Sequence, residues 1–287
     1  MILNLVKALI FGMIEGITEW LPVSSTGHLI LAESFLHFQN VSENFWSVFE
    51  VVIQLGAIMA VVLLYFKKLW PLKYKEVKTE NSRMKKKKLA FDMDILKLWL
   101  KIIIACLPAV AIVVVGLDEF AEKYLYNPTV ISIMLILVGI IFIILENHPK
   151  KKFRVNSINE LTYKDAIIIG LFQVIAALLP GTSRSGMTII GALLIGISRV
   201  AAAEYTFYLA IPAMAGASLL KILKYGLGFS ASELFILVFA MVVAFAISLF
   251  VIKFMMNYIK KHDFKVFGWY RIVLGIGMLL LVLLKVF

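Results

Sequence analysis

The sequence has one cysteine and few charged residues for its length, and each shortage excludes a class of protein. Cys106 is the only cysteine among 287 residues, so the chain can form neither an internal disulfide nor a cysteine-based metal site. Charged residues make up 16% of the chain, whereas a soluble domain has about 25%. The chain is therefore not an ordinary soluble domain.

Two local patterns are also missing. The N-terminus has neither a basic region nor a small-residue cleavage site, and it runs directly into Glu15 and Glu19, so we do not interpret it as a cleavable signal peptide. The G-x-x-x-x-G-K-[ST] pattern of a P-loop does not occur, which argues against nucleotide binding.

What the sequence does contain is apolar residues. They form 62% of the chain, and the mean hydropathy is +0.94. Several apolar segments reach the roughly 20 residues that a helix needs to span a bilayer. These values predict an all-α integral membrane protein in which residues 1–287 form a single membrane domain.

The apolar segments predict six transmembrane helices and a shorter helix pair in each half of the chain. The six spans are residues 45–66, 99–117, 128–145, 200–223, 233–253 and 268–287. Near the start, two shorter apolar segments flank a polar run, and they predict a re-entrant pair of half-helices that meet at residues 22–27. Irregular backbone at membrane depth is tolerated only inside the protein or along a water-filled cavity.

The formal charge of +11 is concentrated in the loops between the spans. Loops 67–98, 150–154 and 256–265 are rich in lysine or arginine, whereas loop 118–127 carries three acidic residues. Because basic loops stay on the cytoplasmic side, this pattern places both termini outside. It also indicates a protein oriented in a membrane rather than one that binds nucleic acid.

The second half of the chain repeats features of the first half at an offset of 158 residues. This alignment pairs Gly12 with Gly170, Glu15 with Gln173, Pro22 with Pro180, Ser24 with Thr182, and Ser25 with Ser183. We interpret residues 1–146 and 160–287 as two repeats, each a re-entrant pair plus three spans. Their topologies would be inverted, and inverted repeats place a shared site near the bilayer midplane.

The first polar run, residues 15–28, carries two carboxylates, three hydroxyls and an imidazole. Charges at membrane depth are costly and by default indicate a functional site. Glu15 and Glu19 are four residues apart on one helical face and suit a hard divalent cation such as Mg²⁺ or Ca²⁺. Ser25 and His28 offer a nucleophile and an acid or base within hydrogen-bond reach of each other. The alternative is that the glutamates only solvate an aqueous vestibule and that the histidine is structural.

The second polar run, residues 180–188, surrounds Arg184 with hydroxyls and glycines and leads into an apolar helix. Backbone N–H groups at a helix start, together with hydroxyls and a guanidinium, are typical of a phosphate cradle. The alternative for the small residues is a helix break that lets two helices approach closely. An intramembrane guanidinium still requires an anion.

Together the two runs resemble the bacterial undecaprenyl-pyrophosphate phosphatases of the bacitracin-resistance type. The resemblance rests on Glu15-x-x-x-Glu19, on Pro22-Val-Ser-Ser-Thr-Gly-His28 and on the run from Pro180 to Thr188. It covers the whole chain, and neither motif departs from the family pattern. It implies removal of the terminal phosphate from a C55 prenyl pyrophosphate, which yields the carrier lipid for cell-wall polymers and confers bacitracin resistance. It further implies a divalent cation and a site at the outer face of the bacterial cytoplasmic membrane.

On this interpretation the catalytic residues are Ser25, His28, Glu19 and Arg184, and the metal ligands are Glu15 and Glu19. Direct attack by His28 or by metal-bound water stays open beside attack by Ser25. We expect the four catalytic residues to converge on one mid-membrane cavity that is open to the outside. The residues expected to orient the diphosphate are Ser24, Thr26, Gly27, Thr182, Ser183, Ser185, Gly186 and Thr188.

The expected partners are a polyprenyl diphosphate lipid and the bilayer, and nucleic acid is not among them. The sequence does not fix the oligomeric state, and a homodimer is compatible with it. The rival function is a transporter or flippase for a lipid phosphate, because inverted repeats with broken helices are also a common architecture of transporters.

Overall fold

A computed structural model describes residues 1–78, 85–148, 152–226 and 228–286, with the backbone alone for residues 74–78 and 85–88. Within these residues, six helical segments are long and apolar enough to cross a membrane. They are α3 and α4 together (Phe45–Val52 and Gln54–Leu64), α6 (Met93–Val115), α8 (Pro128–Asn147), α11 (Arg199–Tyr225), α12 (Ala231–Ile259) and α13 (Lys265–Leu283). The predicted six spans are confirmed, and only their ends shift.

The largest shift at the start of a span is in α6, which begins at Met93 rather than at residue 99. The Asp92 side chain accepts hydrogen bonds from the backbone N–H groups of Asp94 (3.0 Å) and Ile95 (3.4 Å). A carboxylate N-cap of this kind satisfies donors that a helix start would otherwise leave unpaired. The polar residues before Trp99 therefore belong to the helix.

Each half of the chain also contains a pair of shorter helices joined by a tight turn. The first pair is α1 (Ile2–Thr18) and α2 (Ser25–Leu36), and the second is α9 (Tyr163–Leu178) and α10 (Arg184–Leu194). Both turns end in a serine with a left-handed backbone, since φ is 75° at Ser24 and 71° at Ser183. Each of these serines caps the following helix through its hydroxyl oxygen, which accepts from the backbone N–H three residues later.

These two caps correct the alignment within the turns. They match Ser24 with Ser183, so Ser25 corresponds to Arg184, and the sequence-based pairings of Ser24 with Thr182 and of Ser25 with Ser183 are wrong. The stretch between Gly170 and Ser183 is therefore one residue longer than the stretch between Gly12 and Ser24. A weak sequence match cannot reveal such an insertion, whereas the cap geometry does.

The helices that precede the turns keep the original offset. Gly12 on α1 and Gly170 on α9 each lie against the backbone of a long span. At Gly12 an added Cβ atom would stand 2.6 Å from the Ala240 carbonyl oxygen of α12, and at Gly170 it would clash with the Ala105 carbonyl oxygen of α6. Only glycine permits such close contact. The first helix of each pair thus packs on a span from the other half of the chain.

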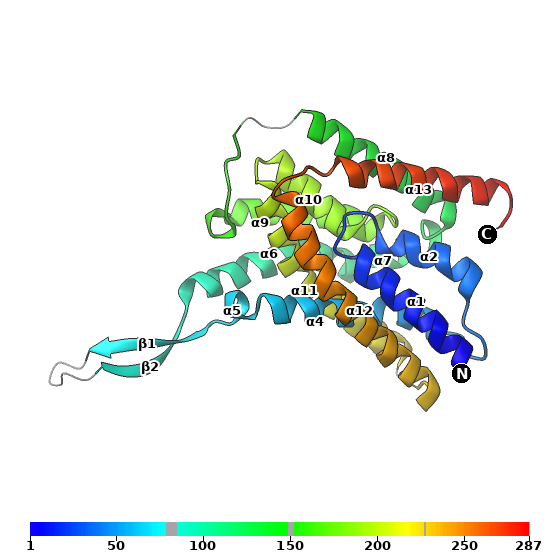
Figure 1. The fold of residues 1–287 in the computed structure, drawn as a ribbon, viewed down its shortest axis with the longest axis horizontal. Coiled ribbons are helices and arrows are strands. Elements are labelled where there is room, and N and C mark those ends of the chain that lie inside the picture. Colours follow the sequence, from blue (N-terminus) through cyan, green and yellow to red (C-terminus); the bar gives the residue numbers. More distant parts are fainter. Residues whose placement is uncertain (79–84, 149–151, 227, 287) are drawn as a thin grey trace.

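Two further contacts join the halves directly. Helix α4 packs against α11, and α8 packs along α13 (Figure 1). The α8–α13 contact is closest at Gly139 and Gly268, where an added Cβ at either glycine would stand within 3 Å of the other's carbonyl oxygen (2.6 and 2.8 Å).

The predicted all-α architecture is confirmed, and loop 67–98 adds a short hairpin that the sequence analysis did not predict. After the short helix α5 (Phe66–Leu69), strands β1 (Leu72–Lys78) and β2 (Lys85–Phe91) form an antiparallel hairpin with Leu72 opposite Phe91. A backbone hydrogen bond from Asp92 N–H to the Pro71 carbonyl (2.7 Å) closes its base. Among the predicted loop residues, Arg83, Lys150 and Lys151 lie outside the described part of the chain. Two short elements complete the described fold, α7 (Leu117–Tyr124) and the 3₁₀ turn η1 (Ile158–Glu160).

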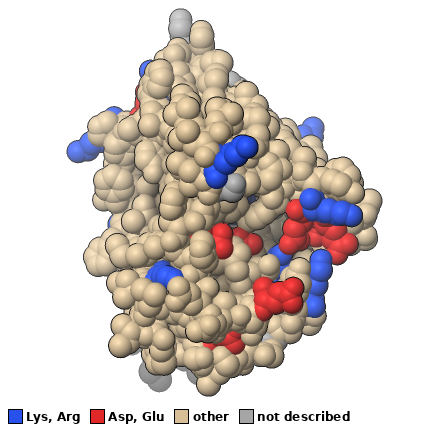
Figure 2. Space-filling model, turned by 90° about the vertical axis from the view of Figure 1, so that its right-hand side faces the viewer, with Lys and Arg blue, Asp and Glu red and all other residues tan. Residues whose placement is uncertain are grey.

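The two ends of the molecule differ in what they carry. Both chain termini lie at one end and the β1–β2 hairpin projects from the opposite end (Figure 1). On the terminus-bearing end, acidic side chains gather on one part of the surface among a few lysines, and the rest is largely uncharged (Figure 2). Two ion pairs belong to this end, Lys221–Glu122 (2.6 Å) and Lys224–Glu119 (2.9 Å).

Candidate active site

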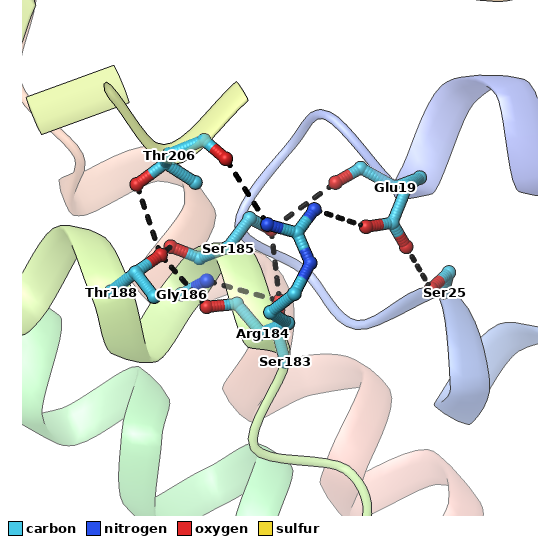
Figure 3. Close-up of polar contacts among 8 residues, drawn as sticks. All are labelled: Glu19, Ser25, Ser183, Arg184, Ser185, Gly186, Thr188 and Thr206. Carbon is cyan, nitrogen blue, oxygen red and sulfur yellow. Dashed lines mark hydrogen bonds and ion pairs between the residues drawn. The ribbon is translucent and has the colours of Figure 1, made fainter. Parts of the chain in front are cut away.

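Glu19 joins the two turns of the molecule. It follows the last turn of α1, and its carboxylate contacts the first residues of both α2 and α10. One oxygen accepts a hydrogen bond from the Ser25 hydroxyl (2.7 Å), and the other accepts from Arg184 Nη2 (2.7 Å; Figure 3). The Glu19 and Arg184 side chains are only 7% and 15% exposed. The predicted group of Glu19, Ser25 and Arg184 is therefore assembled in the folded chain.

The neighbouring hydroxyls hold Arg184 in place. Its Nη1 donates to the Thr206 carbonyl of α11 (3.1 Å), and the Thr206 hydroxyl lies 2.9 Å from that of Thr188 (Figure 3). The Ser185 hydroxyl donates to the Glu19 backbone carbonyl (3.2 Å). The guanidinium is thus fixed from two sides, which leaves Nε without a protein partner.

Sequence reasoning missed Arg271, which joins the two turns from α13. This arginine is fully buried. Its Nη1 donates to the Pro22 carbonyl (3.2 Å) of the first turn, and its Nη2 donates to the carbonyls of Gly181 (2.8 Å) and Thr182 (3.0 Å) of the second turn. The signal was present, because Arg271 is a charged residue inside a predicted span. The argument applied to Arg184 applies equally to it.

Ser25 and Arg184 occupy corresponding positions, since each is the first residue of the second helix of its pair. The backbone N–H groups at a helix start attract anions, because they are unpaired and lie at the positive end of the helix dipole. Two such starts meet at Glu19, together with a guanidinium. The arrangement suits a doubly charged phosphate group beside a serine hydroxyl.

The predicted contact between Ser25 and His28 is wrong. The Ser25 hydroxyl donates to Glu19 instead, and both ring nitrogens of His28 have other partners. Nδ1 lies 2.7 Å from the Ser24 carbonyl oxygen and Nε2 lies 2.8 Å from the Tyr270 hydroxyl. The His28 ring points from α2 toward α13, where it meets Tyr270. The four predicted catalytic residues therefore do not all meet.

The residues expected to orient a diphosphate have mainly local partners. Gly27 and Gly186 supply the N–H groups that bind the capping serines. The Thr182 hydroxyl donates to the Leu179 carbonyl (2.7 Å), and Ser183 and Ser185 bond to each other (3.1 Å). These groups build the turns. Thr26 and Ser24 belong to the same first turn, with Thr26 half-buried and Ser24 buried.

A cavity lies beside the C-terminal half of α2, on the terminus-bearing end of the molecule. It has a volume of about 430 Å³ and is lined by residues that include Ile30, Glu33, His37, Tyr126 and Val286. None of the four predicted catalytic residues lines it. In the Glu19 group, both carboxylate oxygens of Glu19 are occupied by Ser25 and Arg184.

Glu15 is the residue that best fits a cation. Its side chain is fully buried, and both carboxylate oxygens lack a hydrogen-bond partner in the described structure. Both Glu19 oxygens are already bound, and no group of three or more His, Cys, Asp or Glu residues in the described ranges is placed to hold a metal. A divalent cation bound here would depend on Glu15, with Glu19 one turn away, and on oxygens from water or a bound phosphate.

Comparison with known proteins identifies the family. The model of the family described as "Bacitracin resistance protein BacA" matches residues 8–277. This chain belongs to that family. It is 53% identical over 280 residues to the undecaprenyl-diphosphatase of Enterococcus faecalis, covering 97% of each chain. It is 54% identical over 278 residues to undecaprenyl-diphosphatase 1 of Clostridium acetobutylicum, covering 96% of this chain and 97% of that protein. The Glu19 group, Arg271 and both turns fall within the part that matches the BacA model.

Proposed function

We propose that the chain hydrolyses undecaprenyl pyrophosphate to undecaprenyl phosphate and inorganic phosphate. The observation that carries the proposal is the Ser25–Glu19–Arg184 arrangement. A serine hydroxyl donates to a carboxylate, and the same carboxylate binds an arginine at the start of the opposite helix. Membership of a family with relatives named undecaprenyl-diphosphatase supports the substrate. The product would return the carrier lipid to cell-wall synthesis and so confer bacitracin resistance.

The Ser25 oxygen attacks the terminal phosphorus while Glu19 takes the hydroxyl proton. The bond from that phosphorus to the bridging oxygen breaks, and the lipid monophosphate leaves. Water then attacks the phosphoserine, which restores the serine and releases inorganic phosphate. Arg184 would release Glu19 and bind the phosphate oxygens, because positioning with charge stabilisation accounts for most of the catalysis in phosphoryl transfer.

Attack by His28 or by metal-bound water remains the rival first step. The partners of His28 argue against its role as nucleophile, because both ring nitrogens are already engaged. Metal-bound water would leave the Ser25–Glu19 hydrogen bond without a function in the chemistry.

Glu15 and Glu19 would hold the divalent cation, Mg²⁺ or Ca²⁺. The cation supplies positive charge that neutralises the phosphate oxygens. The unpaired oxygens of Glu15 support this assignment. Chelation with EDTA should then abolish hydrolysis, and added Mg²⁺ or Ca²⁺ should restore it. Full activity after chelation would remove the cation from the proposal.

The proposed setting is the bacterial cytoplasmic membrane, with both helix pairs re-entrant and the two repeats inverted. The exchange of contacts between the halves supports inversion, since α1 packs on α12 while α9 packs on α6. The site would open to the outer face, where both termini would also lie. A lipid-phosphate flippase could use the same anion site, but binding alone does not require a serine paired with a carboxylate.

The test is phosphate release by the purified protein from undecaprenyl pyrophosphate. Wild type should release phosphate and Ser25→Ala should lose at least about 10³-fold in kcat, as expected when a nucleophile is removed. Ser34→Ala is the matched control, because Ser34 lies on the same helix and its hydroxyl bonds only locally, to the Ile30 carbonyl (2.9 Å). Near-normal turnover by Ser25→Ala would show that serine is not the nucleophile. No release by wild type, together with movement of the lipid across proteoliposomes, would favour the flippase.

A further inference from the structure

Tyr270 and His28 form a side-chain pair next to the site. The Tyr270 hydroxyl lies 2.8 Å from His28 Nε2. The two rings are nearly parallel, with an interplanar angle of 4° and centroids 5.6 Å apart. Tyr270 comes from α13 and is 47% exposed, whereas His28 comes from α2 and is half-buried. The proposed hydrolysis assigns no role to this pair.

The hydrogen bonds of His28 fix its tautomer. A carbonyl oxygen can only accept, so the nitrogen facing Ser24, Nδ1, carries a proton. In the neutral ring Nε2 is then an acceptor, and the Tyr270 hydroxyl donates to it. Tyr270 therefore selects the tautomer that can bind the Ser24 carbonyl, and the stacked ring holds the imidazole in that plane.

Ser24 is a backbone position that needs such support. Its φ of 75° with ψ of 96° is unfavourable for a residue with a side chain. Its carbonyl accepts from the His28 ring at 2.7 Å and only weakly from the His28 backbone N–H at 3.4 Å. The direction of the Ser24 carbonyl sets the start of α2, and Ser25 is the next residue.

The same stretch of α13 reaches both turns. Tyr270 acts on the first turn through His28, and the adjacent Arg271 binds Pro22 in the first turn and Gly181 and Thr182 in the second. Two consecutive residues of one helix thus set the position of the nucleophile's turn relative to the arginine's turn.

We infer that Tyr270 and His28 are positioning residues for the reaction, which hold the Ser24 turn so that Ser25 faces Glu19 and the phosphate. The inference rests on the proposed function. His28 on this account neither takes the proton of Ser25 nor attacks phosphorus. Its loss should lower kcat and leave KM nearly unchanged, since neither side chain of the pair is assigned a contact with substrate.

Replacements of His28 separate positioning from acid–base chemistry. In His28→Asn the side-chain N–H₂ can occupy the place of Nδ1 and donate to Ser24, but the side chain has no basic nitrogen. We expect His28→Asn to keep kcat within about threefold of wild type, whereas His28→Ala and His28→Gln lose about tenfold or more, the scale of one net hydrogen bond. If His28→Asn is as inactive as His28→Ala while its melting temperature matches that of wild type, the inference fails.

A double-mutant cycle tests the link to Tyr270. Tyr270→Phe should lower kcat about fivefold to tenfold in the wild-type background, the scale of a single hydrogen bond. It should have no effect in His28→Asn, because asparagine does not reach the hydroxyl. The matched control is Tyr258→Phe, since Tyr258 also stacks on a histidine, His262 (centroids 4.4 Å apart), but at the connection between α12 and α13 rather than at either turn. Full activity of Tyr270→Phe, or equal losses in both backgrounds, would overturn the inference.

All variants are measured in the full-length protein on undecaprenyl pyrophosphate beside wild type and Ser25→Ala. Hydrolysis by wild type with the wrong pattern among the variants contradicts only the positioning role. Absence of hydrolysis by wild type contradicts the proposed function itself.

Discussion

At the scale of single residues, the Glu19 carboxylate binds both Ser25 and Arg184, and the proposed reaction would draw both groups away from it. Its carboxylate accepts from Ser25 and Arg184 at equal distances of 2.7 Å. A carboxylate buried with an arginine is stabilised by that charge, and removal of either partner leaves the other uncompensated in a low-dielectric region. In the proposed reaction the substrate phosphate would bind Arg184, and Glu19 would be free to accept the serine proton.

Replacement of Arg184 tests this division of roles. Arg184→Lys keeps the positive charge but loses the forked geometry that binds Glu19 and the Thr206 carbonyl together. We expect kcat to fall about 10²- to 10³-fold, the typical loss for a group that stabilises transition-state charge. Steady-state phosphate release measures it. Lys253→Arg on α12 is the control for exchanging one basic residue for another within a span. A wild-type kcat in Arg184→Lys would show that the forked guanidinium geometry is not required.

The central residues of the site were predictable from sequence, whereas their supports were not. Glu19, Ser25 and Arg184 stand out because polar groups in apolar segments are costly. Thr206 and Tyr270 are single residues within spans, and only the folded backbone shows what they face. The contact expected between Ser25 and His28 failed because sequence spacing gives neither the direction of the ring nor the nearness of α13.

At the scale of elements, close helix contacts decide how the two turns meet. The α8–α13 contact depends on Gly139 and Gly268, and α13 also carries Arg271 to both turns. Side chains larger than hydrogen at either glycine would push α13 away. The turns would then lose the guanidinium that joins them.

Two glycines of α13 provide a matched pair for this claim. A Cβ at Gly268 would lie 2.8 Å from the Gly139 carbonyl oxygen, whereas a Cβ at Gly277 would meet nothing within 4 Å. Gly268→Ala should destabilise the protein by about 1–3 kcal/mol, as overpacking does. Gly277→Ala should be neutral or stabilising, because alanine favours a helix by about 1 kcal/mol. Thermal unfolding in detergent measures both, and equal melting temperatures would show that the α8–α13 contact is not tight.

The elements were largely predictable and the turns only partly so. Apolar length predicted the six spans because a bilayer requires it, and the paired short segments predicted the two helix pairs. The hairpin in loop 67–98 was missed because its lysines were interpreted only as a charge signal. The additional residue between Gly170 and Ser183 was missed because both turns are rich in small hydroxyl residues, which align equally well in either register.

At the scale of the whole molecule, the account depends on orientation in the membrane. Both termini lie at the end opposite the lysine-rich hairpin (Figure 1). Since basic segments stay in the cytoplasm, the terminus-bearing end should face outward. The acidic surface and the cavity of about 430 Å³ would then lie on the outer side.

Labelling of single cysteines in intact cells tests this orientation. Cys106 is the only native cysteine, so Cys106→Ala gives a background without thiols. In it, Ile2→Cys and Lys285→Cys should react with a membrane-impermeant maleimide, and Lys73→Cys should react only after the cells are opened. Ile2 and Lys73 are exposed in the folded chain. The reverse pattern would place the site's access on the cytoplasmic side.

The most direct test of the account is a search for phosphate on Ser25 during turnover. Undecaprenyl pyrophosphate labelled at its terminal phosphate is mixed with the full-length protein, the reaction is quenched within one turnover, and peptides are analysed by mass spectrometry. The account predicts phosphoserine at residue 25 in wild type, and more phosphoserine under conditions that slow the attack of water on it. Ser25→Ala should carry no phosphoserine and should release no phosphate. Label on His28, or near-normal release by Ser25→Ala without any phosphorylated residue, would contradict it.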